Sequence, residues 1–127
     1  MKPTILNTEQ KIHEAAKKVF LKYGFHGTKL QQVAETANVN KSVIHYYYRT
    51  KVKLYKAILR NIILYIESAD FTDKNSQEEN LKVKWFLFSE IYNNKCLLEN
   101  TVKELYPSQW REKLQRLLVL FDIEQIF

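Results

Sequence analysis

The 127-residue chain is poor in residues that interrupt helices, with two glycines and two prolines. All-β and dinucleotide-binding α/β folds need many turns, so this scarcity argues against both classes. Cys96 is the single cysteine, which excludes an internal disulfide and a cysteine-based zinc site. A run of about 18 apolar residues is missing, as is the apolar core of a signal peptide. We therefore expect an all-α cytoplasmic protein, with no membrane partner, cofactor or metal.

What the chain does contain is positive charge, and this charge is unevenly placed. Residues 1–60 hold 12 of the 20 basic residues and three of the 14 acidic residues, a net charge of +9. Residues 61–127 hold eight basic and 11 acidic residues, a net charge of −3. A basic half favours a nucleic-acid partner, and an acidic half stays away from phosphates. The alternative is a lysine-rich surface that only faces water.

Residues 28–48 predict two short helices around a tight turn. Thr28 and Gln31 fit a capping box for the first helix, and Asn38 suits the left-handed conformation at its end. Asn40 then caps the second helix. The inner faces hold Leu30, Val33, Ala34 and Ala37 in the first helix, and Ile44, Tyr47 and Tyr48 in the second. A helix-turn-helix presents its second helix to the major groove, so this segment is a candidate DNA reader.

Helical periodicity also covers the flanking segments. We expect a first helix over residues 8–23, ended by Gly24. A long fourth helix should begin at residue 50 or 51 and run toward Ala69, with an apolar stripe along one side. The fold class is therefore all-α, with a three-helix DNA-binding domain joined by a long fourth helix to a C-terminal helical part.

Capping residues predict three more helices in that C-terminal part. Ser76 begins a helix over about residues 77–98, Thr101 begins a short helix ended by Pro107, and Ser108 begins the last one. The polar stretch 72–77 is the predicted joint between the two parts.

The first half of the chain contains an ordered series of small, apolar and aromatic residues at defined distances from one another. Its members are Ile12, Ala15-Ala16, Val19-Phe20, Gly24-Phe25, Thr28, Val33-Ala34, Ala37-Asn38-Val39 and the run NKSVIHYYYRTKVKL over residues 40–54. This pattern resembles the DNA-binding domain of TetR-family transcriptional regulators. The chain departs from the family pattern at Asn38, Ser42, Val43 and His45, where glycine, glycine, threonine and tyrosine are usual.

By position, the resemblance implies that nine residues contact DNA. Those facing the bases are Lys41, Ser42, Val43 and Tyr46. Those contacting phosphates are Thr28, Lys29, His45, Tyr47 and Lys51. The alternative for each is a solvated surface group, or for Tyr47 a core residue. We expect Ile44 and Tyr48 to be structural.

The resemblance divides the chain into a DNA-binding domain over residues 1–50 and a ligand-binding and dimerisation part over residues 51–127. Family members are normally longer, so this second part is expected to be shortened. The residues suspected of lining a ligand pocket are Trp85, Phe88, Tyr92, Trp110 and Phe121. Aromatic residues at helical spacing more often fill a core, which is the alternative. Glu90 and Glu99 lie near them in sequence and would suit a cationic ligand.

The resulting hypothesis is a sequence-specific transcriptional regulator. We expect a ligand-responsive repressor that binds a near-palindromic operator in double-stranded DNA as a homodimer, with a small-molecule effector. The alternative, a helical protein-interaction module, would not explain the basic first half. An enzyme is disfavoured because His13, His26 and His45 lie apart in the sequence and there is no glycine-rich phosphate loop.

Overall fold

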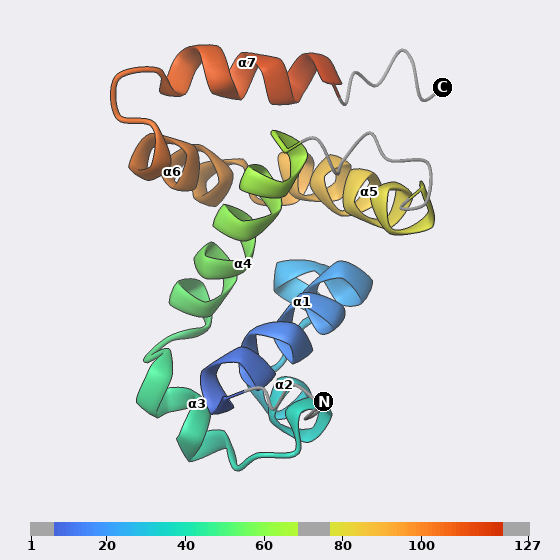
Figure 1. The fold of residues 1–127 in the computed structure, drawn as a ribbon, viewed down its shortest axis with the longest axis vertical. Coiled ribbons are helices and arrows are strands. Elements are labelled where there is room, and N and C mark those ends of the chain that lie inside the picture. The colour runs from blue at the N-terminus through green and yellow to red at the C-terminus, as the bar shows by residue number, and fades with distance from the viewer. Residues whose placement is uncertain (1–6, 69–76, 121–127) are drawn as a thin grey trace, which may run out of the picture. The chain divides into compact units, whose positions relative to one another are not determined.

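The computed structural model describes residues 7–68 and 77–120, and every regular element within these ranges is an α-helix. In chain order they are α1 (Thr8–Gly27), α2 (Leu30–Ala37), α3 (Lys41–Tyr47), α4 (Lys51–Ile66), α5 (Gln77–Asn93), α6 (Lys95–Leu105) and α7 (Trp110–Leu120) (Figure 1). The predicted all-α fold is confirmed. The chain divides into two compact units, Met1–Ile58 and Leu59–Phe127, so that α4 contributes to both. None of the described helices has the length and apolarity that a membrane span requires.

Helix α1 begins with a reciprocal cap that joins Asn7 and Gln10. The Asn7 side chain accepts a hydrogen bond from the Gln10 N–H at 2.8 Å, and the Gln10 side chain accepts one from the Asn7 N–H at 3.1 Å. Gly24 interrupts the helix with a positive φ of 74°, where the sequence predicted its end. A further turn follows and closes at Gly27. The buried stripe is the predicted one, formed by Ile12, Ala15, Ala16, Val19 and Phe20.

Helix α2 begins one residue later than the predicted capping box requires. Lys29 is the N-cap, and its N–H donates to the Gln32 side chain at 2.8 Å. Thr28 is instead buried, and its hydroxyl donates to the Gly24 carbonyl at 2.7 Å. The predicted pairing of Thr28 with Gln31 is therefore wrong. The interruption at Gly24 leaves a carbonyl without its helical partner, and the threonine hydroxyl satisfies it.

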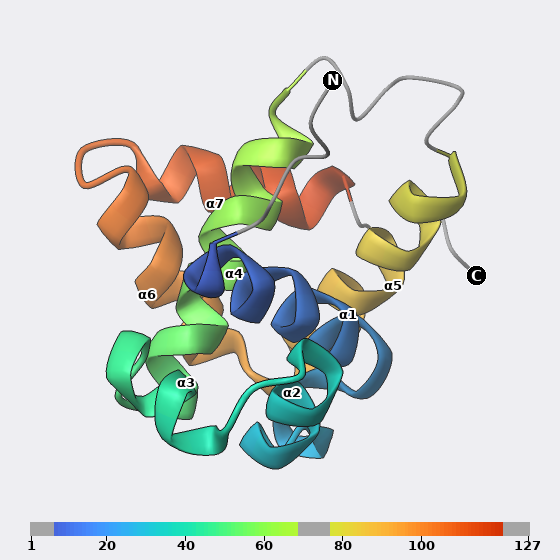
Figure 2. The ribbon, with the colours of Figure 1, turned by 60° about the horizontal axis from the view of Figure 1, so that its bottom comes forward.

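The turn between α2 and α3 has the conformation expected from its asparagine. Asn38 adopts φ 57° and ψ 47°, the left-handed region that asparagine tolerates better than most residues. Its N–H donates to the Glu35 carbonyl, and the Val39 N–H donates to the Ala34 carbonyl at 3.0 Å. These bonds close α2 and turn the chain toward α3 within three residues (Figure 2).

Helix α4 carries the apolar stripe that its sequence predicts. The Thr50 hydroxyl accepts a hydrogen bond from the Lys53 N–H at 3.1 Å and so caps its first turn. In the first unit the Tyr55 ring packs edge-on against Phe20 and Phe25, with centroids 5.2 and 4.8 Å away. The buried residues of α4 are Leu54, Tyr55, Ile58, Leu59, Ile62, Ile63 and Ile66.

In the second unit the helix is interrupted at Asn94, four residues before the predicted helix end at Leu98. Asn94 adopts φ −149° and ψ 39°, and α6 begins directly after it. Thr101 is consequently interior to α6, and its hydroxyl donates to the Leu97 carbonyl at 2.8 Å. The predicted helix start at Thr101 is wrong, because a threonine hydroxyl can bond the preceding turn of a helix as well as cap one. The predicted start at Ser76 lies outside the described residues.

Side chains of the second unit tie the end of α4 to each of its neighbours. The Tyr65 hydroxyl donates to the Asn80 side chain on α5 at 2.6 Å. Arg60 of α4 forms an ion pair with Glu104 of α6 at 3.7 Å. Glu67, directly after α4, forms an ion pair with Lys113 of α7 at 3.0 Å. These interactions connect the second half of α4 and the residue after it to α5, α6 and α7.

Candidate nucleic-acid interface

Helix α3 presents a polar outer face, opposite the side chain that holds it to the unit. Ile44 is fully buried and anchors the helix. Lys41, Ser42 and Tyr46 are exposed, and the Tyr46 side chain has an exposed fraction of 80%. Within the described residues Lys41 takes part in no ion pair. The face that the sequence assigned to bases is thus open to a macromolecular partner, with Val43 half-buried beside it.

A hollow of about 840 Å³ brings several of these side chains together. Ser42, Val43, Tyr46 and Tyr47 line it with the turn before α3, Ala34 and Glu35 of α2, and Thr8 of α1. Sequence reasoning missed Thr8 and Glu35 as neighbours of this face. Local periodicity carries no signal for Thr8, because only tertiary packing brings the start of α1 to a helix more than 30 residues away.

Two adjacent tyrosines form an aromatic pair at the end of α3. The Tyr46 and Tyr47 rings meet edge-on with centroids 5.0 Å apart, and Tyr47 remains 39% exposed. Tyr47 therefore belongs to the surface, and its alternative interpretation as a core residue is wrong. His45 is exposed as well, with Nδ1 lying 3.4 Å from the Arg49 carbonyl oxygen. The helix end thus offers two phenols and an imidazole to solvent.

The structure separates the remaining phosphate candidates into three environments. Lys29 is exposed at the start of α2. Lys51 is half-buried, and its Nζ lies 4.3 Å from the centroid of the Phe25 ring. Thr28 is 2% exposed and its hydroxyl is held by the Gly24 carbonyl, so its predicted contact with a phosphate needs a donor that is already used.

Four of the five aromatic residues suspected of lining a ligand pocket lie within the described residues, on α5 and α7. Trp85, Phe88 and Tyr92 follow each other along α5 with centroids 5.8 and 5.5 Å apart, and Trp85 and Tyr92 are more than half exposed. Trp110 lies between the cations of Lys103 and Arg111, at 4.4 and 5.0 Å. Phe121 lies outside the described residues. Spacing along a helix indicated a common face and could not show whether that face points inward.

The acidic residues expected to suit a cationic ligand also lie elsewhere. Glu90 is buried in α5, and Glu99 forms an ion pair with Lys95 at 3.8 Å. Neither lines the hollow of about 860 Å³ that the second unit contains between the end of α4 and α7.

Comparison with known proteins supports the interpretation of the first unit. A tight turn followed by an exposed helix, held on two packed helices, defines a helix-turn-helix protein. Residues 12–58 match the family described as bacterial regulatory proteins of the tetR family. This part of the chain is therefore similar to the TetR family of transcriptional regulators.

Two curated relatives and one solved structure illustrate this similarity. The regulator RutR of Escherichia coli K12 is 48% identical over 52 residues, which are 41% of this chain and 24% of RutR. The repressor NicS of Pseudomonas putida KT2440 is 36% identical over 63 residues, which are 50% of this chain and 30% of NicS. The structure of HlyIIR, a haemolysin II transcriptional regulator, aligns with a TM-score of 0.62 at 27% identity, over 94% of this chain and 75% of HlyIIR. The chain thus spans less than a third of these curated relatives.

Proposed function

We propose that the chain is a sequence-specific DNA-binding repressor whose recognition helix is α3. The observation that carries this proposal is the open polar face of α3, with Lys41, Ser42 and Tyr46 exposed while Ile44 anchors the helix from behind. Such a helix fits the width of the major groove, where lysine, hydroxyl and apolar side chains can distinguish base edges. The net charge of +9 over residues 1–60 supplies attraction to phosphates.

The roles of individual residues follow from where they lie. Lys41, Ser42, Val43 and Tyr46 read base edges, while Lys29, His45, Tyr47 and Lys51 contact phosphates. Thr28 contributes from inside the fold by holding the interruption at Gly24, which precedes α2. Thr8 and Glu35 border the same hollow as Tyr46.

We further propose that residues 1–50 contact DNA, together with Lys51 at the start of α4, and that residues 51–127 otherwise carry dimerisation and the response to a small-molecule effector. A dimer would place two copies of α3 in successive major grooves, about 34–36 Å apart, and so favour a near-palindromic operator. The HlyIIR and NicS names describe a transcriptional regulator and a repressor, which agrees with this assignment.

The test selects bound sequences from a random DNA pool and measures their affinity across a salt series. Two half-sites related by symmetry are expected. With roughly six to ten phosphate contacts, affinity should fall by about 10³–10⁵ between about 50 and 200 mM salt. Unselective, salt-insensitive binding would overturn the proposal and favour a protein-interaction module.

Two matched variants separate base reading from general charge. Lys41→Ala removes a cation from the proposed recognition face, and Lys18→Ala removes one from an exposed position on α1 outside the hollow. Lys41→Ala should relax the selected sequence as well as weaken binding, whereas Lys18→Ala should leave the sequence preference intact. Equal effects of both variants would contradict a recognition role for α3.

A further inference from the structure

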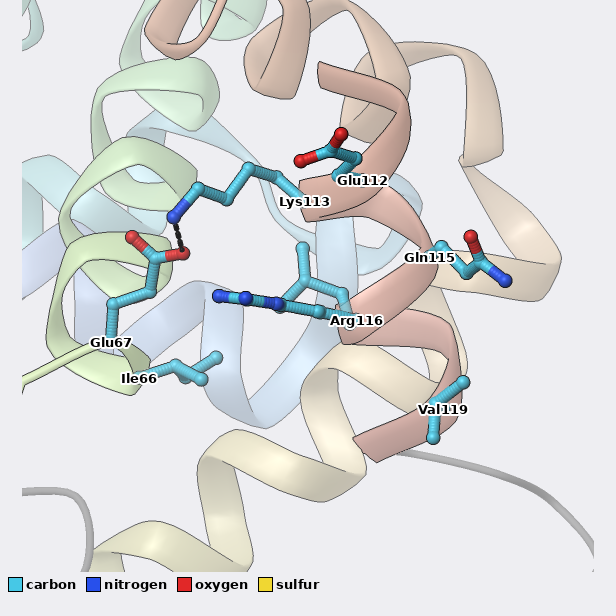
Figure 3. A pocket seen from close by; sticks show the side chains of 8 residues that line it. Ile66, Glu67, Glu112, Lys113, Gln115, Arg116 and Val119 are labelled. Atoms are coloured by element: carbon cyan, nitrogen blue, oxygen red, sulfur yellow. Dashed lines mark ion pairs between the residues drawn. The ribbon is translucent and has the colours of Figure 1, made fainter. Parts of the chain in front are cut away.

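The second unit contains an open hollow of about 860 Å³ between the last turn of α4 and α7. Its apolar lining residues are Ile66 from α4 and Leu117 and Val119 from α7. Four of its lining residues are charged, and Figure 3 shows Glu67 and Lys113 joined across the hollow. The volume lies within the range of small-molecule sites, about 300–1,000 Å³.

The carboxylate of Glu67 is already engaged by two partners. Its Oε1 accepts from the Lys113 ammonium at 3.0 Å, and its Oε2 accepts from the Tyr106 hydroxyl. Burial raises the pKa of the Glu67 carboxyl, but hydrogen bonds from Tyr106 and Lys113 and the charges of Lys113 and Arg116 outweigh it and lower the pKa below its usual value. Glu67 therefore remains an anion whose two oxygens are both occupied.

The same arrangement affects the hydroxyl of Tyr106. Burial, the hydrogen bond to the Glu67 carboxylate and the negative charge of that carboxylate raise the pKa of Tyr106 to about 12. The phenol keeps its proton at any physiological pH, so it continues to donate to Glu67. This leaves Glu67 little capacity to bind a cationic ligand in the hollow.

Among the described residues, Arg116 is the cation of the hollow whose guanidinium forms no close ion pair, although its charge acts on Glu67. Figure 3 shows its guanidinium reaching across the hollow toward Ile66 and Glu67. Within residues 7–68 and 77–120 it forms no ion pair with a carboxylate. The nearby Glu112 stands in the first turn of α7, where the helix N-terminus compensates a negative charge. The charged donors of the hollow that remain outside an ion pair within the described residues are therefore those of Arg116.

We propose that this hollow binds an organic anion with one carboxylate and an apolar body. The carboxylate binds Arg116, whose planar guanidinium matches a carboxylate with two parallel hydrogen bonds. The apolar body lies along Ile66 and Leu117. Because Lys113 also lines the hollow, the bound carboxylate competes with Glu67 for its ammonium.

This competition has a regulatory consequence, which rests on the proposed function. Glu67 directly follows α4, and Lys113 belongs to α7, so their ion pair fastens the end of α4. A ligand that binds Lys113 weakens its ion pair with Glu67 and so loosens the C-terminal end of α4. The N-terminal end of α4 follows α3. The anion therefore acts as the effector that weakens operator binding.

The binding experiment titrates the full chain with three ten-carbon probes in a calorimeter, below their micelle concentrations. Sodium decanoate carries the expected charge, decan-1-ol carries none, and decyltrimethylammonium carries the opposite charge. Decanoate should bind at least about tenfold more tightly than decanol, as expected for a hydrogen bond between charged groups. Equal binding of decanoate and decanol, preference for the cation, or no binding of decanoate would overturn the proposal.

Substitutions on α7 locate the site. Arg116→Gln should reduce decanoate affinity by about tenfold or more and leave decanol unchanged, while Arg116→Lys should retain part of the preference. Arg111→Gln is the matched control, because Arg111 lies on the same helix but stacks on Trp110 outside the hollow. Circular dichroism verifies that all three variants stay folded. An unchanged affinity in folded Arg116→Gln would refute the site.

A DNA-binding arm distinguishes the two proposals. Decanoate should weaken binding to the selected operator in the unsubstituted chain and have no such effect in Arg116→Gln. If decanoate binds as expected but no operator is found, the proposed function fails and the anion site stands. If operator binding is normal and decanoate does not bind, the anion site fails and the proposed function stands.

Discussion

The two units of the chain use their charged side chains in different ways. In the first unit Lys41 remains exposed beside an aromatic pair, on a helix anchored by Ile44. In the second unit Glu67 is paired with Lys113 and Arg60 with Glu104. An exposed charge can bind a partner of opposite charge. A paired charge holds two helices together unless a ligand competes for one member of the ion pair.

The largest expected effect separates anchoring from recognition within α3. Ile44→Ala should lower the free energy of unfolding by about 2–5 kcal/mol, because it leaves a cavity behind the recognition helix. Tyr46→Ala should change it by less than about 0.5 kcal/mol, since the side chain is 80% exposed. Urea denaturation measures both. A large loss of stability in Tyr46→Ala would show that the face is structural.

A smaller effect compares the two asparagine turns. Asn38→Ala should lower the free energy of unfolding by about 1 kcal/mol, because φ is 57° at this position. Asn38→Gly should leave that free energy unchanged or raise it, because glycine adopts positive φ without strain. Asn94 has a negative φ, and its buried side-chain nitrogen has no hydrogen-bond partner within the described residues. Asn94→Ala should therefore be close to neutral. Thermal unfolding of the three variants checks the comparison, which fails if alanine is equally costly at both positions.

The ion pair of Glu67 should give the second unit a pH-dependent stability. The pKa of Glu67 is lowered in the folded state, so its contribution is present above the ordinary carboxyl range and is lost as pH falls through the folded value. Glu67→Gln should thus be less stable than the unsubstituted chain near neutral pH, with the difference shrinking in acid. Glu104→Gln is the control, because its pair with Arg60 is about half exposed and should matter little at either pH. A constant difference across the pH series would refute this account.

The smallest expected effect concerns His45. Its imidazole is exposed at the end of α3 and is assigned a phosphate contact, so His45→Ala should weaken operator binding a few-fold at fixed salt. His26→Ala is the control, because it removes an exposed imidazole from the last turn of α1 and should leave the affinity unchanged. Fluorescence anisotropy measures the affinities. Equal losses in the two variants would contradict the assigned contact.

The sequence predicted most where a single residue dictates the backbone. Gly24, Asn38 and Thr50 mark helix boundaries close to where the structure has them, because each acts through its own conformation or a hydrogen bond in the next turn. The boundary at Asn94 was missed, because it depends on which side chains of α6 become buried. Local rules do not determine that choice.

The candidate sites show the same limit. The exposed face of α3 was predicted from the period of its apolar residues, which needs no tertiary information. The hollow between α4 and α7 was not, because Ile66 and Leu117 lie some 50 residues apart in the chain. The aromatic row on α5 was assigned to a pocket and lies largely at the surface, since periodicity cannot tell which face a neighbouring helix will cover.

The stacking of Lys51 on Phe25 affects the thermodynamics of complex formation. A lysine ordinarily loses side-chain entropy when a phosphate holds it, but this ammonium is already restrained 4.3 Å from the ring centroid. Much of the ordering has therefore occurred during folding, before any encounter with a duplex. Phe25→Leu would increase the side-chain entropy of Lys51 in the unbound protein. Calorimetry should then measure a less favourable entropy of association.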